Sequence, residues 1–274
     1  MILLGFFCEY NIKVGVSCDF VPGARLSIGG KETEVQVLEN LQRLEEAGIP
    51  FGIITVLAAH TRPVLKSIHD NFMSRESGFR ILSFYKGPDS RPIEGLGFSN
   101  NEIVEALKDI FVHWFESGCA YDVAPLSDYL WVTVMKMLEM QGEVFKRSNI
   151  DELAMIVNTD GKLREAGYRF GDEDKYYGDL STQTLKEVFD SKRYEESVVA
   201  FKADQQRICG DCPYLGFCNT FSAFAVPDGG RDEGNCQWAK PMMQFIEGYL
   251  IENDVDDETL RLFAHELHDE GELY

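Results

Sequence analysis

The chain has 274 residues, 45% of them hydrophobic and 26% charged, which is the composition of a globular protein with room for one large domain or two smaller ones. Its 46 acidic side chains outnumber 26 basic ones and give a formal net charge of −20. An acidic surface repels phosphate backbones and anionic lipids, so we expect neither nucleic acid nor membrane as a partner. A basic peptide, including a basic leader, would be attracted.

The first ten residues, MILLGFFCEY, are apolar but lack a basic start and a small-residue cleavage site. No later stretch reaches the length of a bilayer span. We interpret the segment as a first core element of a cytoplasmic protein. The odd number of seven cysteines, without a secretory signal, agrees with a reducing compartment.

From residue 12, short apolar runs alternate with longer stretches of helical periodicity, a pattern typical of strand-helix units that carry a parallel sheet. The expected strands cover residues 12–17, 51–58 and 78–85. The expected helices cover residues 31–48, 61–76, 101–118 and 126–141. Three strands are too few to close an eight-stranded barrel, so the sequence predicts an α/β fold with a partial (β/α) barrel over residues 1–148.

The pattern changes near residue 148, where we place a domain boundary. The string ELAMIVNTDGKLREAGYRF predicts a β-hairpin that turns at Asp160 and Gly161, because an Asp-Gly pair supplies the geometry of a tight turn. Two short helices, a cysteine-rich loop and a C-terminal pair of helices follow in the expected order. Residues 149–274 therefore read as a small α+β domain.

The sequence holds one strong chemical signal, a set of four cysteines in CGDCPYLGFC and GNC: Cys209, Cys212, Cys218 and Cys236. The two-residue gap lets the first two thiolates converge from one turn, and the other two return from further along the chain. Four thiolates suit a 4Fe-4S cluster or a structural zinc ion, which spacing alone separates poorly. We favour the cluster over zinc, and either metal over packed or disulfide-bonded cysteines.

Longer strings carry a resemblance to a known family. KVGVSCDFVPGARLSIGGKETEVQVLENLQRLEEAGIPFGIITVLA resembles the fourth and fifth strand-helix units of radical S-adenosylmethionine (radical SAM) enzymes, where a strand ending in G-V-S-x-D meets the cofactor. IVNTDGKLREAG, YYGDLSTQTLKEVFDS and CGDCPYLGFC resemble the C-terminal iron-sulfur domain called SPASM. The resemblance covers about residues 10–240. It implies an enzyme that modifies a peptide or protein with S-adenosylmethionine as cofactor.

Two departures from the family pattern change what it implies. The defining C-x3-C-x2-C loop would lie before the first strand and occurs nowhere in this sequence, so we expect that this chain alone does not cleave S-adenosylmethionine. The SPASM pattern assigns the four cysteines named above to one outer auxiliary 4Fe-4S cluster. Cysteines of the inner cluster are replaced by Ala166 and Ser222, so the resemblance implies a single auxiliary cluster.

The resemblance also implies roles for single residues. Ser17 and Arg25 would contact the amino-acid part or ribose of S-adenosylmethionine, and the planar fork of Arg25 suits a carboxylate. Ser17 has the alternative of a plain hydroxyl at a strand end. Leu82 would pack against the adenine, although an ordinary core leucine is our preferred interpretation. The candidates for a general base are three acidic residues that nothing in the sequence ranks: Asp172, Asp174 and Asp179.

The leading interpretation is a portion of a radical SAM/SPASM enzyme that modifies a peptide or protein and binds one auxiliary cluster. The alternative is a catalytically inactive peptide-binding or scaffold protein whose cluster or zinc ion is structural.

Overall fold

The computed structural model describes residues 2–21, 23, 25–73, 78–83, 99–119, 121–140, 155–165, 176–218 and 236–270. The chain divides into two units, the first made of residues 1–85, 91–130 and 265–274, the second of residues 86–90 and 131–264. The boundary expected near residue 148 lies outside the described residues and stays a prediction. Within the described part, no helix is both long enough and apolar enough to cross a membrane.

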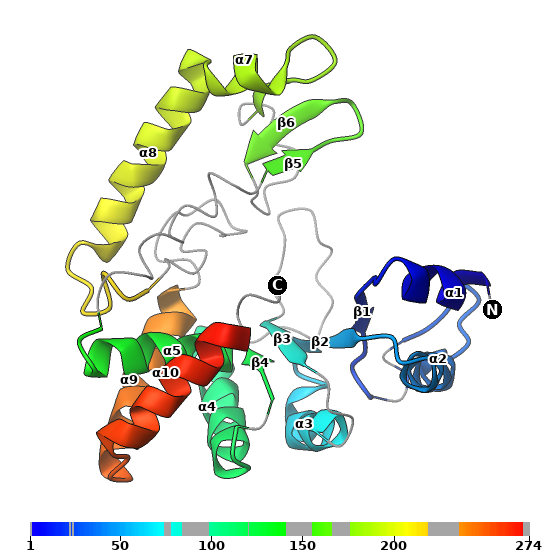
Figure 1. Ribbon diagram of the computed structural model, residues 1–274, viewed down its shortest axis with the longest axis vertical. Coiled ribbons are helices and arrows are strands. Elements are labelled where there is room, and N and C mark those ends of the chain that lie inside the picture. Colours follow the sequence, from blue (N-terminus) through cyan, green and yellow to red (C-terminus); the bar gives the residue numbers. More distant parts are fainter. Residues whose placement is uncertain are drawn as a thin grey trace. The chain divides into compact units, whose positions relative to one another are not determined.

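The first unit contains a four-stranded parallel sheet in the order β1-β2-β3-β4 (Figure 1). Its strands are β1 (Val14–Ser17), β2 (Phe51–Leu57), β3 (Phe79–Ser83) and β4 (Val123–Ala124). The three strands expected from the sequence are confirmed, each slightly shorter than predicted. The fourth has only two residues, too few for a periodic pattern to reveal.

Helices cover one face of this sheet, as Figure 1 shows. They are α2 (Glu34–Glu46), α3 (Leu65–Met73), which follows the short 3-10 helix η1 (Arg62–Val64), and α4 (Asn100–Glu116). Alternate side chains of the strands and the apolar stripes of the helices form the buried core. Its members include Leu41, Leu44, Ile53, Leu57, Ile68, Phe72, Phe79, Ile81, Ile103, Leu107, Ile110, Phe111 and Trp114.

The start of α4 is fixed by a capping box. The hydroxyl of Ser99 accepts a hydrogen bond from the Glu102 amide at 3.3 Å, and the Glu102 carboxylate accepts one from the Ser99 amide at 2.9 Å. At the other end, the buried Trp114 donates its indole N–H to the carbonyl of Tyr121 at 2.9 Å. Trp114 and Phe111 are core side chains, as their helical spacing predicted.

The N-terminal segment is a helix, α1 (Ile2–Glu9), and not the core element that we expected. Leu3 is 64% exposed, and Phe6 and Tyr10 are exposed as well. A short helix turns only one stripe toward a neighbour, so an almost continuous apolar run leaves much of its surface in solvent. The expectation of a buried first segment was wrong for this reason.

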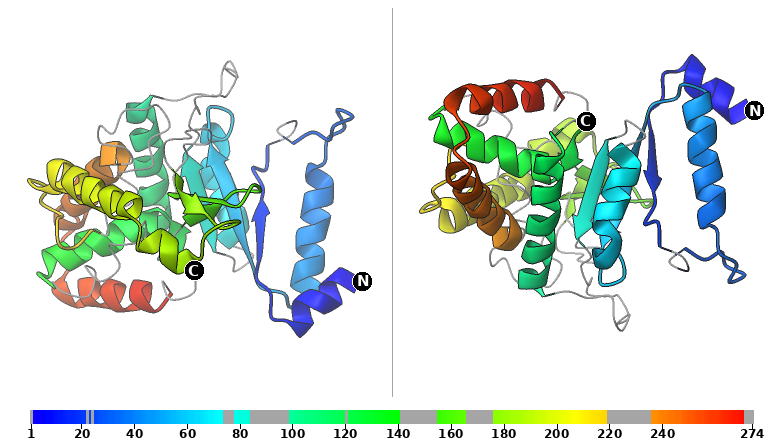
Figure 2. Two further views of the ribbon diagram at one scale, coloured as in Figure 1. Left: turned by 90° about the horizontal axis from the view of Figure 1, so that it is seen from above. Right: turned by 90° about the horizontal axis from the view of Figure 1, so that it is seen from below.

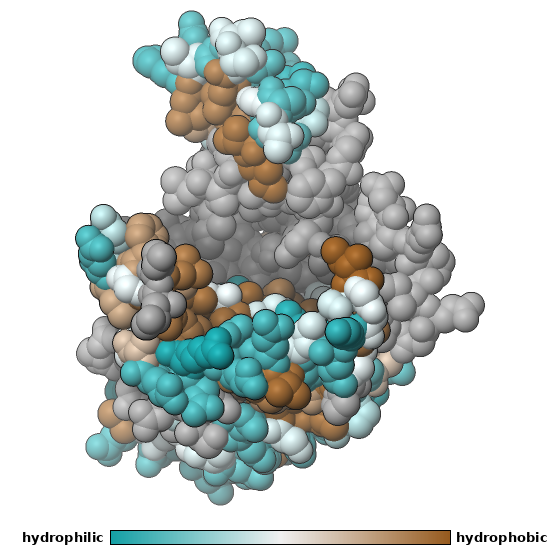
Figure 3. Space-filling view, turned by 90° about the vertical axis from the view of Figure 1, so that its right-hand side faces the viewer, coloured by the Kyte–Doolittle hydropathy of each residue, from teal (hydrophilic) through white to brown (hydrophobic). Residues whose placement is uncertain are grey.

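The second unit begins with a three-stranded antiparallel sheet of β5 (Met155–Val157), β6 (Lys162–Glu165) and β7 (Tyr176–Asp179). The hairpin expected at Asp160 and Gly161 is confirmed: Gly161 has a φ of +82°, and Asp160 accepts a hydrogen bond from the amide of Lys162 at 3.2 Å. Apolar side chains reach the surface here, and Val157 is 55% exposed. Figure 3 shows brown, hydrophobic patches near its top.

The described part of the second unit also contains helices. They are residues 131–137 of α5 (Leu126–Met137), α7 (Leu185–Phe189), α8 (Lys192–Cys209), α9 (Cys236–Glu252) and residues 257–264 of α10 (Asp257–Glu270). One of the two helices expected to be short, α8, has 18 residues. The N-cap residue of α8 is Ser191, whose hydroxyl accepts a hydrogen bond from the Tyr194 amide.

Candidate functional site

The sheet of the first unit presents one row of side chains on the face opposite its helices. Across the strands, Ser17 pairs with Ile54, and Ile54 with Arg80, so all three share this face. Leu82 lies two residues beyond Arg80 and is 40% exposed. The preferred interpretation of Leu82 as a core leucine was wrong, because its neighbour Ile81 takes the side that faces the helices.

Ser17 and Arg25, the two residues expected to meet the cofactor, lie together at the carboxyl end of β1. The Arg25 Nη2 donates a hydrogen bond to the Ser17 Oγ at 3.1 Å. The loop after β1 makes this contact by folding back on itself: the Arg25 carbonyl accepts hydrogen bonds from the amide and the hydroxyl of Thr33. The position suits a site, because ligands of parallel sheets bind at the carboxyl ends of the strands.

Carboxylates surround Arg25. The Asp19 carboxylate accepts a hydrogen bond from the amide of Val56 at 2.9 Å, which holds it at the end of β2. Burial raises the pKa of Glu34, the charges of Glu32 and Asp19 raise it further, and Arg25 opposes them. Arg25 is therefore the cation that balances a group of acids, and its charge is what an anionic ligand group would meet here.

Asp128 is a candidate that sequence analysis missed. It lies in the first turn of α5, just after β4 ends, so it belongs to the same carboxyl edge of the sheet. Burial by surrounding protein atoms and the charge of Asp122 together raise the pKa of Asp128 to about 6, against the opposing charge of Arg80. In the sequence, Asp128 could have been recognised only by its position just after the end of a strand. The two-residue strand β4 is too short to be predicted from the sequence.

The acids that were expected to supply a general base are placed differently. Asp172 and Asp174 lie outside the described residues. Asp179 accepts hydrogen bonds from the hydroxyl and the amide of Ser181, at 2.5 and 2.8 Å, and these bonds lower its pKa. Asp179 therefore stabilises the turn after β7 and is poorly suited to take up a proton.

The cysteine loop of the second unit is a series of tight turns. Cys209 ends α8, its carbonyl accepts from the Cys212 amide at 2.9 Å, and the Cys218 amide donates to the carbonyl of Tyr214 at 2.9 Å. Cys236 is the first residue of α9. Burial raises the pKa of the Cys209 thiol, and the nearby Cys212 adds to the effect. No disulfide joins these described cysteines.

The chemistry of this donor set fits an iron-sulfur cluster. Three thiols lie on consecutive turns, and the fourth stands at a helix N-terminus, where the helix dipole favours a thiolate. Ala166 and Ser222, the replaced positions, lie outside the residues whose side chains are described.

A buried tyrosine inside the loop anchors it to α9. Tyr214 is fully buried, and its hydroxyl donates to the Glu247 Oε2 at 2.9 Å. The Lys136 Nζ donates to both oxygens of Glu247, at 2.6 and 2.7 Å, and lies 5.0 Å from the centre of the Tyr214 ring. Burial, together with the bond to Glu247, raises the pKa of Tyr214, which therefore stays a neutral donor. Sequence spacing does not reveal this network.

Comparisons with known proteins identify the fold. No family model matches the sequence, and no curated protein matches it. Among solved structures, native anSMEcpe with bound AdoMet and the Cp18Cys peptide matches with a TM-score of 0.66 and 17% identity, over 92% of this chain and 73% of that chain. A histidine-tagged form of anSMEcpe with bound AdoMet matches with a TM-score of 0.67 and 17% identity, over 97% of this chain and 71% of that chain. The chain therefore shares the mixed α/β fold of these anSMEcpe structures.

Proposed function

We propose that this chain binds S-adenosylmethionine at the carboxyl edge of β1 to β4, receives a peptide substrate, and holds one auxiliary 4Fe-4S cluster. The observation that carries the proposal is the contact between Arg25 and Ser17 at the end of β1, in a fold similar to that of an AdoMet-bound enzyme. The planar guanidinium of Arg25 suits the cofactor's carboxylate, and its bond to Ser17 orients it in advance.

Other residues of the same sheet face complete the proposed cofactor site. The exposed Leu82 offers an apolar surface for the adenine, as the resemblance to the radical SAM family implies. Asp128, with a pKa of about 6, can exchange a proton near neutral pH and is our candidate for a general base. The sequence has no C-x3-C-x2-C loop, so the proposal assigns cofactor and peptide binding to this chain alone, and not cofactor cleavage.

The cluster proposal rests on the four cysteines of the loop and of α9. A 4Fe-4S cluster held by four thiolates would supply electron transfer or rigidity, because no iron is left open for a substrate. The resemblance to the SPASM pattern, which assigns these four positions to an auxiliary 4Fe-4S cluster, favours this cluster over the alternative of zinc. The ligands would be Cys209, Cys212, Cys218 and Cys236.

A peptide is the proposed substrate because one of the similar structures contains a bound peptide. The net charge of −20 favours peptides with basic residues, including a basic leader. A second candidate function is a catalytically inactive protein that binds a peptide and keeps its cluster for stability, which agrees with four-thiolate ligation that leaves no iron open to a substrate. Both candidates share the cluster and the peptide.

Anaerobic purification followed by iron, sulfide and zinc analysis tests the cluster, and calorimetric titration with S-adenosylmethionine tests the cofactor site. We expect about four irons and four sulfides per chain, and cofactor binding that does not release 5′-deoxyadenosine. Zinc without sulfide would overturn the cluster. Release of 5′-deoxyadenosine by this chain alone would contradict the proposal that it binds the cofactor without cleaving it. Absence of S-adenosylmethionine binding would remove the proposed cofactor site.

A further inference from the structure

Two helices of the first unit bring together three side chains that belong to neither proposed site. His69 and Asp70 lie in the middle of α3, and His113 lies in the last turn of α4, against which α3 packs (Figure 2). The Asp70 Oδ1 is 2.5 Å from the His113 Nε2 and 3.2 Å from the His69 Nδ1. The two imidazole rings are 5.1 Å apart.

No other group of His, Cys, Asp and Glu among the described residues brings three candidate ligand atoms within 4.8 Å of one another. The three side chains differ in exposure: His69 is buried, His113 is half-buried and Asp70 is exposed. The His69 side chain is thus held in the core, and the other two side chains make the group accessible to solvent. An ion can enter from the surface and still meet a fixed nitrogen.

The end of α4 adds an electrostatic contribution. His113 lies in the last turn of this helix, where the backbone carbonyl groups carry partial negative charge that favours a cation.

We propose that His69, Asp70 and His113 bind a divalent transition metal ion, with Zn²⁺ as the expected occupant, and that this ion fastens α3 to α4. Two imidazole nitrogens and one carboxylate oxygen form a donor set that suits Zn²⁺ and leaves one position for water. His113 lies at the end of α4, and in parallel strand-helix units the helix ends lie near the starts of the following strands. The site therefore lies away from the carboxyl edge that carries Ser17, which fits a structural role.

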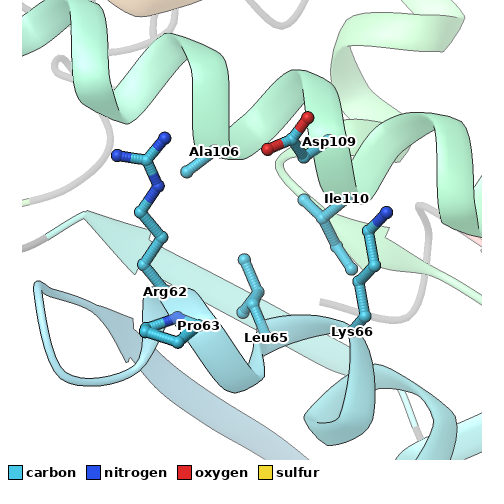
Figure 4. A pocket seen from close by; sticks show the side chains of 7 residues that line it. All are labelled: Arg62, Pro63, Leu65, Lys66, Ala106, Asp109 and Ile110. Carbon is cyan, nitrogen blue, oxygen red and sulfur yellow. The ribbon is translucent and has the colours of Figure 1, made fainter.

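The groove between the same two helices supplies a matched control. One turn before the cluster, a cavity of about 330 Å³ is lined by Arg62, Lys66 and Asp109 together with apolar side chains (Figure 4). Asp109 lies on α4 four residues before His113, so Asp109→Asn removes a carboxylate from the same groove without touching the cluster. His113→Gln removes the ligand, and its amide can still donate a hydrogen bond to Asp70.

Titration with Co²⁺, a spectroscopic substitute for Zn²⁺, distinguishes this site from the cysteines, because thiolate ligands give strong ultraviolet charge-transfer absorption and imidazole and carboxylate ligands do not. We expect the full-length wild type and Asp109→Asn to bind one Co²⁺ that contributes only visible bands. His113→Gln should bind that ion at least about 100-fold more weakly. Zn²⁺ should raise the melting temperature of the first two proteins more than that of the third.

X-ray absorption of the Zn²⁺-loaded wild type gives a test that needs no variant. A nitrogen and oxygen shell at about 2.0–2.2 Å, separate from any sulfur shell at about 2.3 Å, supports the site. The proposal is overturned if His113→Gln and wild type bind Co²⁺ alike, or if Zn²⁺ has sulfur neighbours only. His69, Asp70 and His113 would then only be hydrogen-bonded to one another between α3 and α4. Neither result bears on the iron content of the cysteine loop, so the two proposals fail independently.

Discussion

The guanidinium of Arg25 donates a hydrogen bond to the hydroxyl of Ser17, eight residues earlier, and so closes the loop after β1 onto the end of that strand. The residues of the loop carry several acids, and Arg25 stands among them. In the proposed cofactor site, this guanidinium would have to contact the carboxylate of S-adenosylmethionine in competition with these acids.

Replacing Arg25 with Lys tests this arrangement. Lysine keeps the charge but loses the planar fork and the bond to Ser17. We expect the affinity for S-adenosylmethionine to fall about tenfold, which corresponds to one charge-assisted hydrogen bond. Isothermal titration calorimetry measures it. Lys31→Ala, in the same loop, should bind like wild type, and equal affinity of all three proteins would remove Arg25 from the site.

Replacing Cys212 with Ala tests the cluster ligands. The variant should lose iron, sulfide and the brown colour, and proteases should cut the region around the loop faster, because cluster binding is coupled to local folding. Cys8→Ala removes an exposed thiol of the first unit and should keep all three properties. A Cys212→Ala protein that stays brown and resists proteolysis would show that this ligand is wrongly assigned.

Replacing Tyr214 with Phe tests the anchor of the loop. The change removes the hydroxyl that donates to Glu247 and leaves the buried ring in place. We expect the free energy of unfolding to fall by about 1.5–3 kcal/mol, the range for a hydrogen bond to a charged group. Urea unfolding measures it, with the exposed Tyr10→Phe as control. Equal midpoints for both variants would mean that the bond contributes nothing to stability.

Replacing Asp128 with Asn tests its pKa. The folded-state pKa of about 6 lies above the ordinary 3.8, so the folded protein holds this proton more tightly than the unfolded chain. The carboxyl therefore stabilises below about pH 4, and that contribution is lost as the pH rises through about 6. Asp128→Asn should be more stable than wild type by about 1 kcal/mol at pH 7. For a carboxyl group fully shielded from solvent, the same pKa difference would correspond to about 3 kcal/mol of unfolding free energy. The Asp128 side chain is exposed, so solvent screening reduces the effect.

Urea unfolding of both proteins at a series of pH values supplies the measurement for Asp128. The difference in stability should vanish near about pH 4, where both side chains are neutral. A difference that does not change with pH would contradict the raised pKa. Asp109→Asn serves as the control, since this carboxylate lines the groove beside α3 and not the carboxyl edge of the sheet.

Periodicity in the sequence was enough to predict much of the first unit. The helix expected over residues 31–48 is Glu34–Glu46, and the strand expected over 51–58 is Phe51–Leu57, because both have a buried stripe of the right period. A two-residue strand such as β4 has no period to detect. For the same reason the position of Asp128 at a strand end could not be recognised.

Contacts between distant segments were beyond the sequence. His113 meets Asp70 across 43 residues, and Tyr214 meets Glu247 across 33. No local spacing encodes such pairs, since helix packing creates them. The cysteines were recognisable because three of them lie within ten residues, where the turns of the chain alone bring them near one another.

The bond between Tyr214 and Glu247 has a practical consequence, because it needs no metal. Protein stripped of iron by air would keep its cysteine loop tethered to α9 through this oxygen-to-oxygen contact. Chemical reconstitution with iron and sulfide would then start from a partly ordered template, and repeated loading and stripping should be reversible.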